Sequence, residues 1–162
     1  MLVPTIFDKY VADCMMDGKS IQLSLWDISD QADYEQLRMV SYSRTHVVLV
    51  AFSVDSVDSL ESVKAKWMRE VHDSCPGAPT ILVGLKTDLR ENRVLRQEIQ
   101  SSPLQFVTTQ EGKEYARELG AICYVECSAL TGQGIDNVFE LAVRATLVKS
   151  EEKQGKSCCV VC

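Results

Sequence analysis

The sequence predicts an α/β fold in which a parallel sheet carries helices on both faces, and three observations lead to this prediction. Residues 47–53 and 80–84 form two apolar runs bounded by polar segments, as in strands that are buried on both faces. Between these runs, apolar residues recur at helical spacing, at Leu60, Val63, Trp67 and Val71. A third strand-like run, residues 122–126, follows a second helical pattern, and this alternation of strands and helices is typical of parallel sheets.

The first predicted element is a hairpin. Residues 11–16 and 19–26 flank Asp17-Gly18, a dipeptide typical of two-residue hairpin turns. In the second strand, apolar and polar residues alternate up to Asp27, so we expect one buried face. A carboxylate is therefore expected where this strand leaves the sheet, the edge at which α/β proteins bind ligands. On position alone, Asp27 could equally cap the turn that follows.

The helices that follow have defined boundaries. Acidic residues begin the helix after the first apolar run, and Pro76-Gly77 follows its end. Thr108 and Glu111 have the spacing of a capping box at the start of the second helix, and Gly120 ends that helix. A final helix is marked by apolar residues at Val138, Leu141, Ala142 and Ala145.

Length and composition indicate a single cytosolic domain. The chain has 162 residues, of which 46% are hydrophobic and 25% charged, ordinary values for a globular protein. Its net charge of −6 argues against nonspecific binding to nucleic acid. No apolar run approaches the ~18 residues of a membrane span, and the first residues lack the features of a secretory signal. Seven cysteines and two histidines predict neither a disulfide framework nor a zinc site.

Residues 26–34, Trp-Asp-Ile-Ser-Asp-Gln-Ala-Asp-Tyr, resemble the second switch of Ras-like GTPases, in particular the Rho family. The family pattern is Trp-Asp-Thr-Ala-Gly-Gln-Glu-Asp-Tyr, from which this chain departs at three consecutive positions, Ile28, Ser29 and Asp30, and again at Ala32. In the family, the glycine N–H binds the γ-phosphate. Asp30 instead adds a negative charge, and two like charges ~4 Å apart repel by ~4 kcal/mol at an effective dielectric constant of ~20. We therefore expect weakened coupling to the third phosphate.

Residues 1–10 resemble the first switch and effector loop of the same family, Val-Pro-Thr-Val-Phe-Asx/Glu-x-Tyr. The resemblance implies that Thr5 gives its hydroxyl to Mg²⁺, with Asp27 as the second metal ligand. Without the resemblance, Pro4-Thr5 is only an extended segment. The implied effector residues are Val3, Pro4, Thr5, Ile6, Phe7, Asp8, Lys9 and Tyr10.

Two further segments match the guanine-binding motifs of GTPases. In Leu85-Lys86-Thr87-Asp88, the Asp carboxylate would accept hydrogen bonds from guanine N1–H and its exocyclic amine, and the Lys86 stem would pack along the ring. Leu85 replaces the usual Asn or Thr, and a Lys-x-Asp segment alone is more often an ion-paired loop. In Glu126-Cys-Ser-Ala129, the Ala129 N–H would contact guanine O6 and Ser128 would brace the Asp88 loop. The nucleotide-binding residues implied are Asp27, Ile28, Ser29, Asp30, Gln31, Leu85, Lys86, Thr87, Asp88, Ser128, Ala129 and Leu130, with Gln31 also orienting the catalytic water.

The resemblance also divides the chain into a domain and a tail. Residues 1–148 correspond to the GTPase domain, with a polar insert of the Rho type at about residues 89–105. The flexible tail, residues 149–162, ends in Cys159-Val-Val-Cys162, which has the form of a prenylation site, and Cys158 is a candidate palmitoyl acceptor. One lipid gives marginal membrane binding. We therefore expect a doubly lipidated protein on the cytoplasmic side of the plasma membrane, with a cytosolic pool.

GTPases hold their phosphates with a Gly-x-x-x-x-Gly-Lys-Ser/Thr loop, and these 162 residues contain none. The resemblance begins at the first switch. The expected fold is therefore a P-loop NTPase-like three-layer sheet with helices on both faces that lacks the first strand, the phosphate loop and the first helix. We expect marginal stability and weak nucleotide affinity, and interpret the chain as an incomplete gene model, a splice form or a pseudogene product.

The first functional hypothesis is a monomeric Rho-type GTPase of the fungal branch, which binds GTP and GDP with Mg²⁺ and signals to cytoskeleton, polarity and cell wall. Its expected partners are effector kinases or scaffolds, exchange factors, GTPase-activating proteins and dissociation inhibitors. Hydrolysis of GTP to GDP and phosphate is expected to be impaired. A second hypothesis is a non-catalytic, membrane-tethered interaction protein with a Rho-like surface. A third, a flavodoxin-like or receiver domain, leaves Lys86, Asp88 and Ser128-Ala129 unexplained.

Overall fold

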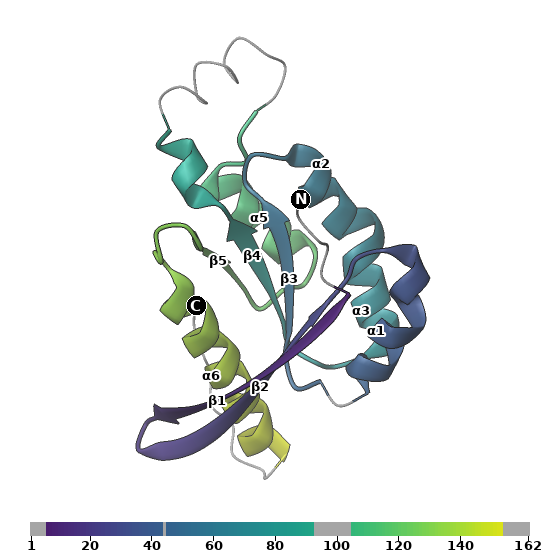
Figure 1. Ribbon diagram of the computed structural model, residues 1–162, viewed down its shortest axis with the longest axis vertical. Coiled ribbons are helices and arrows are strands. Elements are labelled where there is room, and N and C mark those ends of the chain that lie inside the picture. The colour runs from purple at the N-terminus through teal and green to yellow at the C-terminus, as the bar shows by residue number, and fades with distance from the viewer. Residues whose placement is uncertain (1–5, 44, 93–104, 154–162) are drawn as a thin grey trace. The chain divides into compact units, whose positions relative to one another are not determined.

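The computed structural model describes residues 6–43, 45–92 and 105–153. The chain divides into two compact units, Met1–Thr45 and His46–Cys162 (Figure 1). Some of the predicted site residues lie outside the described ranges. They are Val3, Pro4 and Thr5 of the effector loop, most of the insert, and the cysteines Cys158 and Cys159.

The first unit contains an antiparallel hairpin of β1 (Phe7–Met16) and β2 (Lys19–Ile28). Asp17 and Gly18 have φ values of 50° and 76°, the left-handed conformations that a two-residue hairpin turn of the predicted kind requires. The prediction that Asp27 lies where the strand leaves the sheet is wrong by one residue, because β2 continues to Ile28. Main-chain pairing with β1 extends to Phe7 opposite Ile28, and this pairing does not depend on the polarity of the side chains.

After β2 the chain forms a short 3-10 helix and then an α-helix, η1 (Ala32–Tyr34) and α1 (Glu35–Tyr42). Two polar residues of α1, Arg38 and Ser41, are buried. The sequence predicted neither this helix nor its buried arginine.

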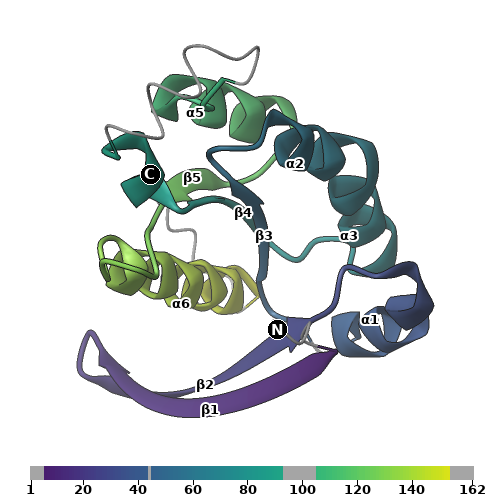
Figure 2. The ribbon, with the colours of Figure 1, turned by 45° about the horizontal axis from the view of Figure 1, so that its top comes forward.

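The second unit is built on a parallel sheet in the order β3 (Val48–Ser53), β4 (Thr80–Leu85) and β5 (Cys123–Glu126). Figure 2 shows α6 (Ile135–Lys153) on one side of the sheet and α2, α3 and α5 on the other. The α6 side contains an apolar cluster of Ile81, Val83, Cys123, Val125, Cys127, Val138 and Ala142. This unit therefore has the predicted three layers. Ala51 of β3 is exposed, contrary to the prediction of burial on both faces, because β3 lies at the edge of this sheet.

The helix predicted between β3 and β4 consists of α2 (Val57–Ser62), a π-helical turn η2 (Val63–Trp67) and α3 (Met68–Ser74). Its predicted apolar positions Leu60, Val63 and Val71 are buried. The Ser56 side chain caps the N-terminus by accepting a hydrogen bond from the Ser59 N–H at 3.2 Å. The π-helical turn was not predicted from the sequence.

The capping box of α5 (Thr109–Glu118) is present as predicted. The Glu111 N–H donates to Thr108 Oγ1 at 3.2 Å, and the Thr108 N–H donates to Glu111 Oε2 at 2.7 Å. Gly120 follows the helix with a φ of 75°. The last helix, α6, runs to Lys153, so the predicted boundary at residue 148 does not coincide with the end of the helix.

Candidate functional site

Two loops leave the carboxyl ends of the neighbouring strands β4 and β5. Because the strands are parallel, these ends meet at one edge of the sheet. The Cys127 N–H donates to the Gly84 carbonyl at 2.9 Å, and the Thr87 N–H donates to the Cys127 carbonyl at 3.3 Å. The predicted guanine-binding segments, 85–88 and 128–130, are therefore held side by side by main-chain hydrogen bonds.

A side-chain hydrogen bond joins the two loops directly. The Ser128 hydroxyl donates to Asp88 Oδ1, which is the bracing contact that the resemblance implied. Ser128 is fully buried, and its Oγ also accepts from the Thr131 N–H at 3.2 Å. Its own N–H donates to the Gln133 carbonyl at 2.9 Å. This network fixes the Asp88 carboxylate at the edge of the sheet.

The other predicted residues of this edge are more accessible. Lys86 and Ala129 are exposed, and Asp88 is half-buried. Lys86 has φ 62° and ψ 40°, a left-handed conformation that is uncommon outside glycine. Its carbonyl accepts from the Leu89 N–H at 3.0 Å, which closes the 3-10 helix η3 (Thr87–Arg90) around Asp88.

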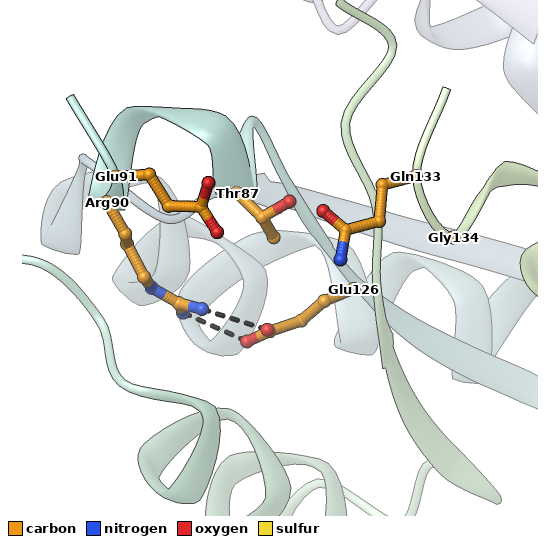
Figure 3. A pocket seen from close by; sticks show the side chains of 6 residues that line it. All are labelled: Thr87, Arg90, Glu91, Glu126, Gln133 and Gly134. Atoms are coloured by element: carbon orange, nitrogen blue, oxygen red, sulfur yellow. Dashed lines mark hydrogen bonds and ion pairs between the residues drawn. The ribbon is translucent and has the colours of Figure 1, made fainter. Parts of the chain in front are cut away.

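A second polar network is centred on Arg90 and Glu126, at the ends of η3 and β5. It was not predicted from the sequence. Arg90 binds Glu126 through two hydrogen bonds, Nη1 to Oε2 at 2.8 Å and Nη2 to Oε1 at 2.9 Å (Figure 3). Glu126 also accepts from the Tyr124 hydroxyl at 2.7 Å and from Thr109 Oγ1 at 3.1 Å. Arg90 Nε donates to the Val107 carbonyl at 3.1 Å. The residues are separated by up to 36 positions in the sequence, so no local pattern indicates the network.

Burial and hydrogen bonding shift two pKa values in this network. Burial opposes ionisation of Glu126, but the hydrogen bonds from Arg90 and Tyr124 outweigh it and hold the pKa of the carboxyl below its usual value. Burial, and then the hydrogen bond to Glu126, raise the pKa of the Tyr124 hydroxyl. The network is thus an ionised Arg–Glu pair with a neutral tyrosine at neutral pH.

A hollow of about 280 Å³ adjoins the network (Figure 3). It is lined by Thr87, Arg90, Glu91, Glu126, Gln133 and Gly134. Gly134 has a φ of 76°, and a Cβ atom there would collide with the Glu126 carbonyl oxygen. The guanidinium of Arg90 is bound to Glu126, so the hollow does not offer it to an anionic ligand.

The predicted metal and catalytic residues belong to the first unit. Asp27 lies opposite Asp8 in the hairpin register, and both are exposed. The Tyr10 hydroxyl donates to Asp8 Oδ2 at 3.3 Å, and the charges of Asp8 and then, more weakly, Asp27 raise the pKa of Tyr10. Thr5, the other predicted magnesium ligand, lies outside the described residues.

The loop that carries Gln31 is held by α1. Arg38 Nη1 donates to the Ser29 carbonyl at 3.0 Å and to the Gln31 carbonyl at 2.8 Å. Arg38 and Ser29 are 4% and 7% exposed, respectively, whereas the side chains of Asp30 and Gln31 are exposed. Ile28, which replaces the threonine of the Rho pattern, is half-buried.

The described part of the predicted effector segment, residues 6–10, is exposed. Phe7 packs edge-to-face on Trp26 with ring centres 5.6 Å apart, and Lys9 Nζ lies 4.8 Å from the centre of the Trp26 ring. This face of the hairpin is therefore aromatic and positively charged at one end.

Among the residues that the structure describes, no group of three or more His, Cys, Asp or Glu side chains could hold a metal ion. A magnesium ion bound through one carboxylate, one hydroxyl and substrate phosphates needs no such group. Over the same residues, no helix has both the length and the apolar character needed to cross a bilayer.

Comparison with known proteins shows extensive similarity. The family model described as "Ras family" matches residues 1–148. The GTP-binding protein rho2 of Schizosaccharomyces pombe is 48% identical over 162 residues, which cover 98% of this chain and 81% of the relative. The GTP-binding protein RHO1 of Candida albicans is 48% identical over 159 residues, covering 98% of this chain and 80% of the relative. The GTP-binding protein RHO1 of Saccharomyces cerevisiae is 47% identical over 155 residues, covering 96% and 74%.

Proposed function

The chain belongs to the Ras family, as a Rho-type small GTPase, and on this premise we propose that it is a guanine-nucleotide-binding switch that signals to the cytoskeleton, cell polarity and the cell wall. The observation that carries the proposal is the hydrogen bond from buried Ser128 to the Asp88 carboxylate. It holds an acidic group at the ligand-binding edge of a parallel sheet.

In the proposed complex, guanine is recognised by groups of the second unit. The carboxylate of Asp88 accepts one hydrogen bond from Ser128 and retains acceptor positions for the guanine N1–H and exocyclic amine. Adenine offers no matching pair of donors. The exposed Lys86 stem covers the ring and the Ala129 N–H binds guanine O6. The donors and acceptors on these two loops thus suit guanine.

The proposed roles at the phosphates follow the resemblance to the Rho pattern. Asp27 and Thr5 are the proposed magnesium ligands, and Gln31 is the residue that orients the attacking water. When bound, Mg²⁺ neutralises the charge on the β- and γ-phosphate oxygens. Asp30 places a carboxylate where the family pattern has glycine, so we propose that coupling to the third phosphate, and with it hydrolysis, is impaired.

The proposed partners bind the effector segment, residues 3–10. Its described part, residues 6–10, is exposed and is the proposed contact surface for effector kinases or scaffolds and for regulators of the nucleotide state.

The proposed membrane attachment is through lipids on the C-terminal cysteines. Cys159 and Cys158 are the proposed lipid attachment sites, supported by the Cys-aliphatic-aliphatic-X pattern. Incorporation of a labelled isoprenoid into the wild-type chain but not into Cys159→Ser tests this part of the proposal.

A titration of the purified chain with fluorescent GDP and GTP analogues, with and without Mg²⁺, tests the central proposal. Magnesium-dependent binding that unlabelled GDP displaces and ADP does not supports it. The absence of binding in a protein whose circular dichroism shows a cooperative fold overturns it.

The second candidate function is a non-catalytic interaction protein with a Rho-like surface. Asp30 favours it, because a fixed negative charge in the second switch opposes a triphosphate. This candidate predicts no nucleotide binding but retained binding of Rho-effector fragments to the hairpin face.

A further inference from the structure

The loop of residues 29–31 is held at its main chain by groups of the same unit. The Ser29 N–H donates to the Ile6 carbonyl at 3.1 Å, and the Gln31 N–H donates to Ser29 Oγ at 3.2 Å. The carbonyl oxygens of Ser29 and Gln31 accept from Arg38, and that of Gln31 also accepts from the Tyr34 N–H at 3.2 Å. Every main-chain N–H and C=O of Ser29 and Gln31 therefore has a partner.

Arg38 connects the two ends of this loop. A single nitrogen, Nη1, donates to both carbonyls, at 3.0 Å and 2.8 Å, from a side chain that is 4% exposed. A guanidinium is planar and presents its donors in a rigid arrangement, and hydrogen bonds shielded from water are strengthened by the low local dielectric. The arginine thus sets the spacing between the two carbonyls.

Ser29 adds a contact that alanine, the residue of the Rho pattern, cannot make. Its hydroxyl oxygen accepts from the N–H two residues further on, a local bond that serine forms in turns. Ser29 is 7% exposed, while the Gln31 side chain is exposed. The main chain of Gln31 is therefore fixed on the buried side, and its side chain is presented to the outside.

We infer that Ser29 and Arg38 are positioning residues that fix the main chain of Gln31 and so aim its side chain at the water that attacks GTP. The inference rests on the proposed function, which assigns that role to Gln31.

Amide hydrogen exchange, followed by NMR on the full chain, tests whether the loop is held. In Ser29→Ala, the Gln31 amide is expected to exchange about tenfold faster than in the wild type, because its acceptor is lost. The Leu82 amide in the core of the second unit should not change. Ser24→Ala, at an exposed serine of β2, is the matched control and should leave both amides unaffected. An unchanged Gln31 amide in Ser29→Ala overturns the inference.

Single-turnover GTP hydrolysis, measured beside the dissociation constant for GDP, tests the positioning role. Ser29→Ala should lower the hydrolysis rate about three- to tenfold, the effect of one hydrogen bond, without changing GDP affinity. Ser29→Thr, which keeps the hydroxyl, should restore the rate, and Arg38→Lys should lower it because the shorter lysine side chain does not bring its nitrogen within reach of both carbonyls. An unchanged rate in Ser29→Ala overturns the inference. If the wild type binds no nucleotide, the proposed function fails and the positioning role with it, while the exchange comparison still decides whether these residues hold the loop.

Discussion

At the scale of single residues, the candidate site depends on a carboxylate held by a buried hydroxyl. Ser128 has no exposed surface, and its Oγ both donates to Asp88 and accepts from the Thr131 N–H. A buried polar group is costly when one of its partners is removed. The orientation of Asp88 is therefore set before any ligand binds, which reduces the ordering needed for binding.

Substitution of Asp88 tests the choice of base. Asp88→Asn replaces one carboxylate acceptor by an amide donor, so both hydrogen bonds to guanine are disturbed. Since a hydrogen bond to a charged group contributes ~1.5–3 kcal/mol, GDP affinity should fall by about 10²- to 10⁴-fold. Xanthine nucleotides, which carry a carbonyl in place of the exocyclic amine, should regain affinity. Isothermal titration measures both, with Asp73→Asn, an exposed aspartate on α3, as the control. Equal GDP affinity in Asp88→Asn and the wild type contradicts the assignment of Asp88.

Substitution of Ser128 tests whether its hydrogen bonds stabilise the fold. Ser128→Ala leaves the Thr131 N–H and one Asp88 oxygen without their partner, so the free energy of unfolding should decrease by ~1–3 kcal/mol. Urea denaturation followed by circular dichroism measures this change. Ser62→Ala, at an exposed serine whose hydroxyl bonds the Asp58 carbonyl, should cost less than ~0.5 kcal/mol. Similar losses in the two variants would show that the Ser128 network adds no stability.

At the scale of elements, the Arg90–Glu126 network connects parts of the second unit that are distant in sequence. Arg90 closes η3, Glu126 ends β5, and Thr109 begins α5. The side chains of Arg90 and Glu126 are 22% and 20% exposed, so the ion pair is more shielded from solvent than a surface pair. The loop of residues 85–88, which we propose binds guanine, is therefore anchored at its end to both a strand and a helix.

The pH dependence of stability tests this anchor. The pKa of Glu126 lies below its usual value of about 4.5 in the folded protein, so the unfolded chain takes up the proton first as the pH falls. The stabilisation is complete above about pH 4.5 and is lost as the pH falls through the folded pKa. Glu126→Gln should decrease the free energy of unfolding by ~1–3 kcal/mol at pH 7, and the difference from the wild type should shrink below pH 4.5.

Urea denaturation across this pH range provides the measurement. Glu140→Gln breaks an exposed pair with Arg144 one helical turn away and should change stability by no more than ~0.5 kcal/mol. A Glu126→Gln deficit that stays constant from pH 7 to pH 3 would contradict the assigned ionisation of Glu126.

At the scale of the whole molecule, the two units differ in how they are built. The second unit has a three-stranded sheet with helices on both faces and an apolar cluster between β4, β5 and α6. The first unit has a two-stranded hairpin, a 3-10 turn and a short α-helix. Two-stranded hairpins are at best marginally stable by themselves.

Native-state amide exchange should show this difference. Amides of β4, whose residues Ile81 and Leu82 have no exposed surface, should exchange at least about tenfold more slowly than amides of β1 and β2, because exchange follows the free energy of local opening. Residue-resolved NMR or mass spectrometry on the full chain measures both sets. Equal protection of the hairpin and of β4 would contradict the prediction.

The sequence alone determined the local elements and the motif positions of this protein. The hairpin turn at Asp17-Gly18, the strands β3 to β5 and the capping box at Thr108 follow from short-range chemistry, in which turn preference, apolar periodicity and side-chain capping act within a few residues. The resemblance to Rho GTPases rested on the same kind of local information, and the similarity to fungal Rho proteins confirms it.

Apart from the contact of Ser128 with the Asp88 loop, which the resemblance implied, only the tertiary structure decided which polar groups meet. Ser128 reaches Asp88 across 40 residues, Arg90 reaches Glu126 across 36, and the buried guanidinium of Arg38 holds the loop of Gln31. The first two pairs are brought together over long sequence separations by the parallel pairing of β4 and β5. The Arg38 contacts span only nine and seven residues, but they depend on the burial of the arginine, which the local pattern did not indicate. The hydrogen-bond partners of Asp88, Glu126 and Gln31, and the pKa of Glu126, are therefore set by the folded chain, whereas the motifs that contain Asp88 and Gln31 can be found in the sequence.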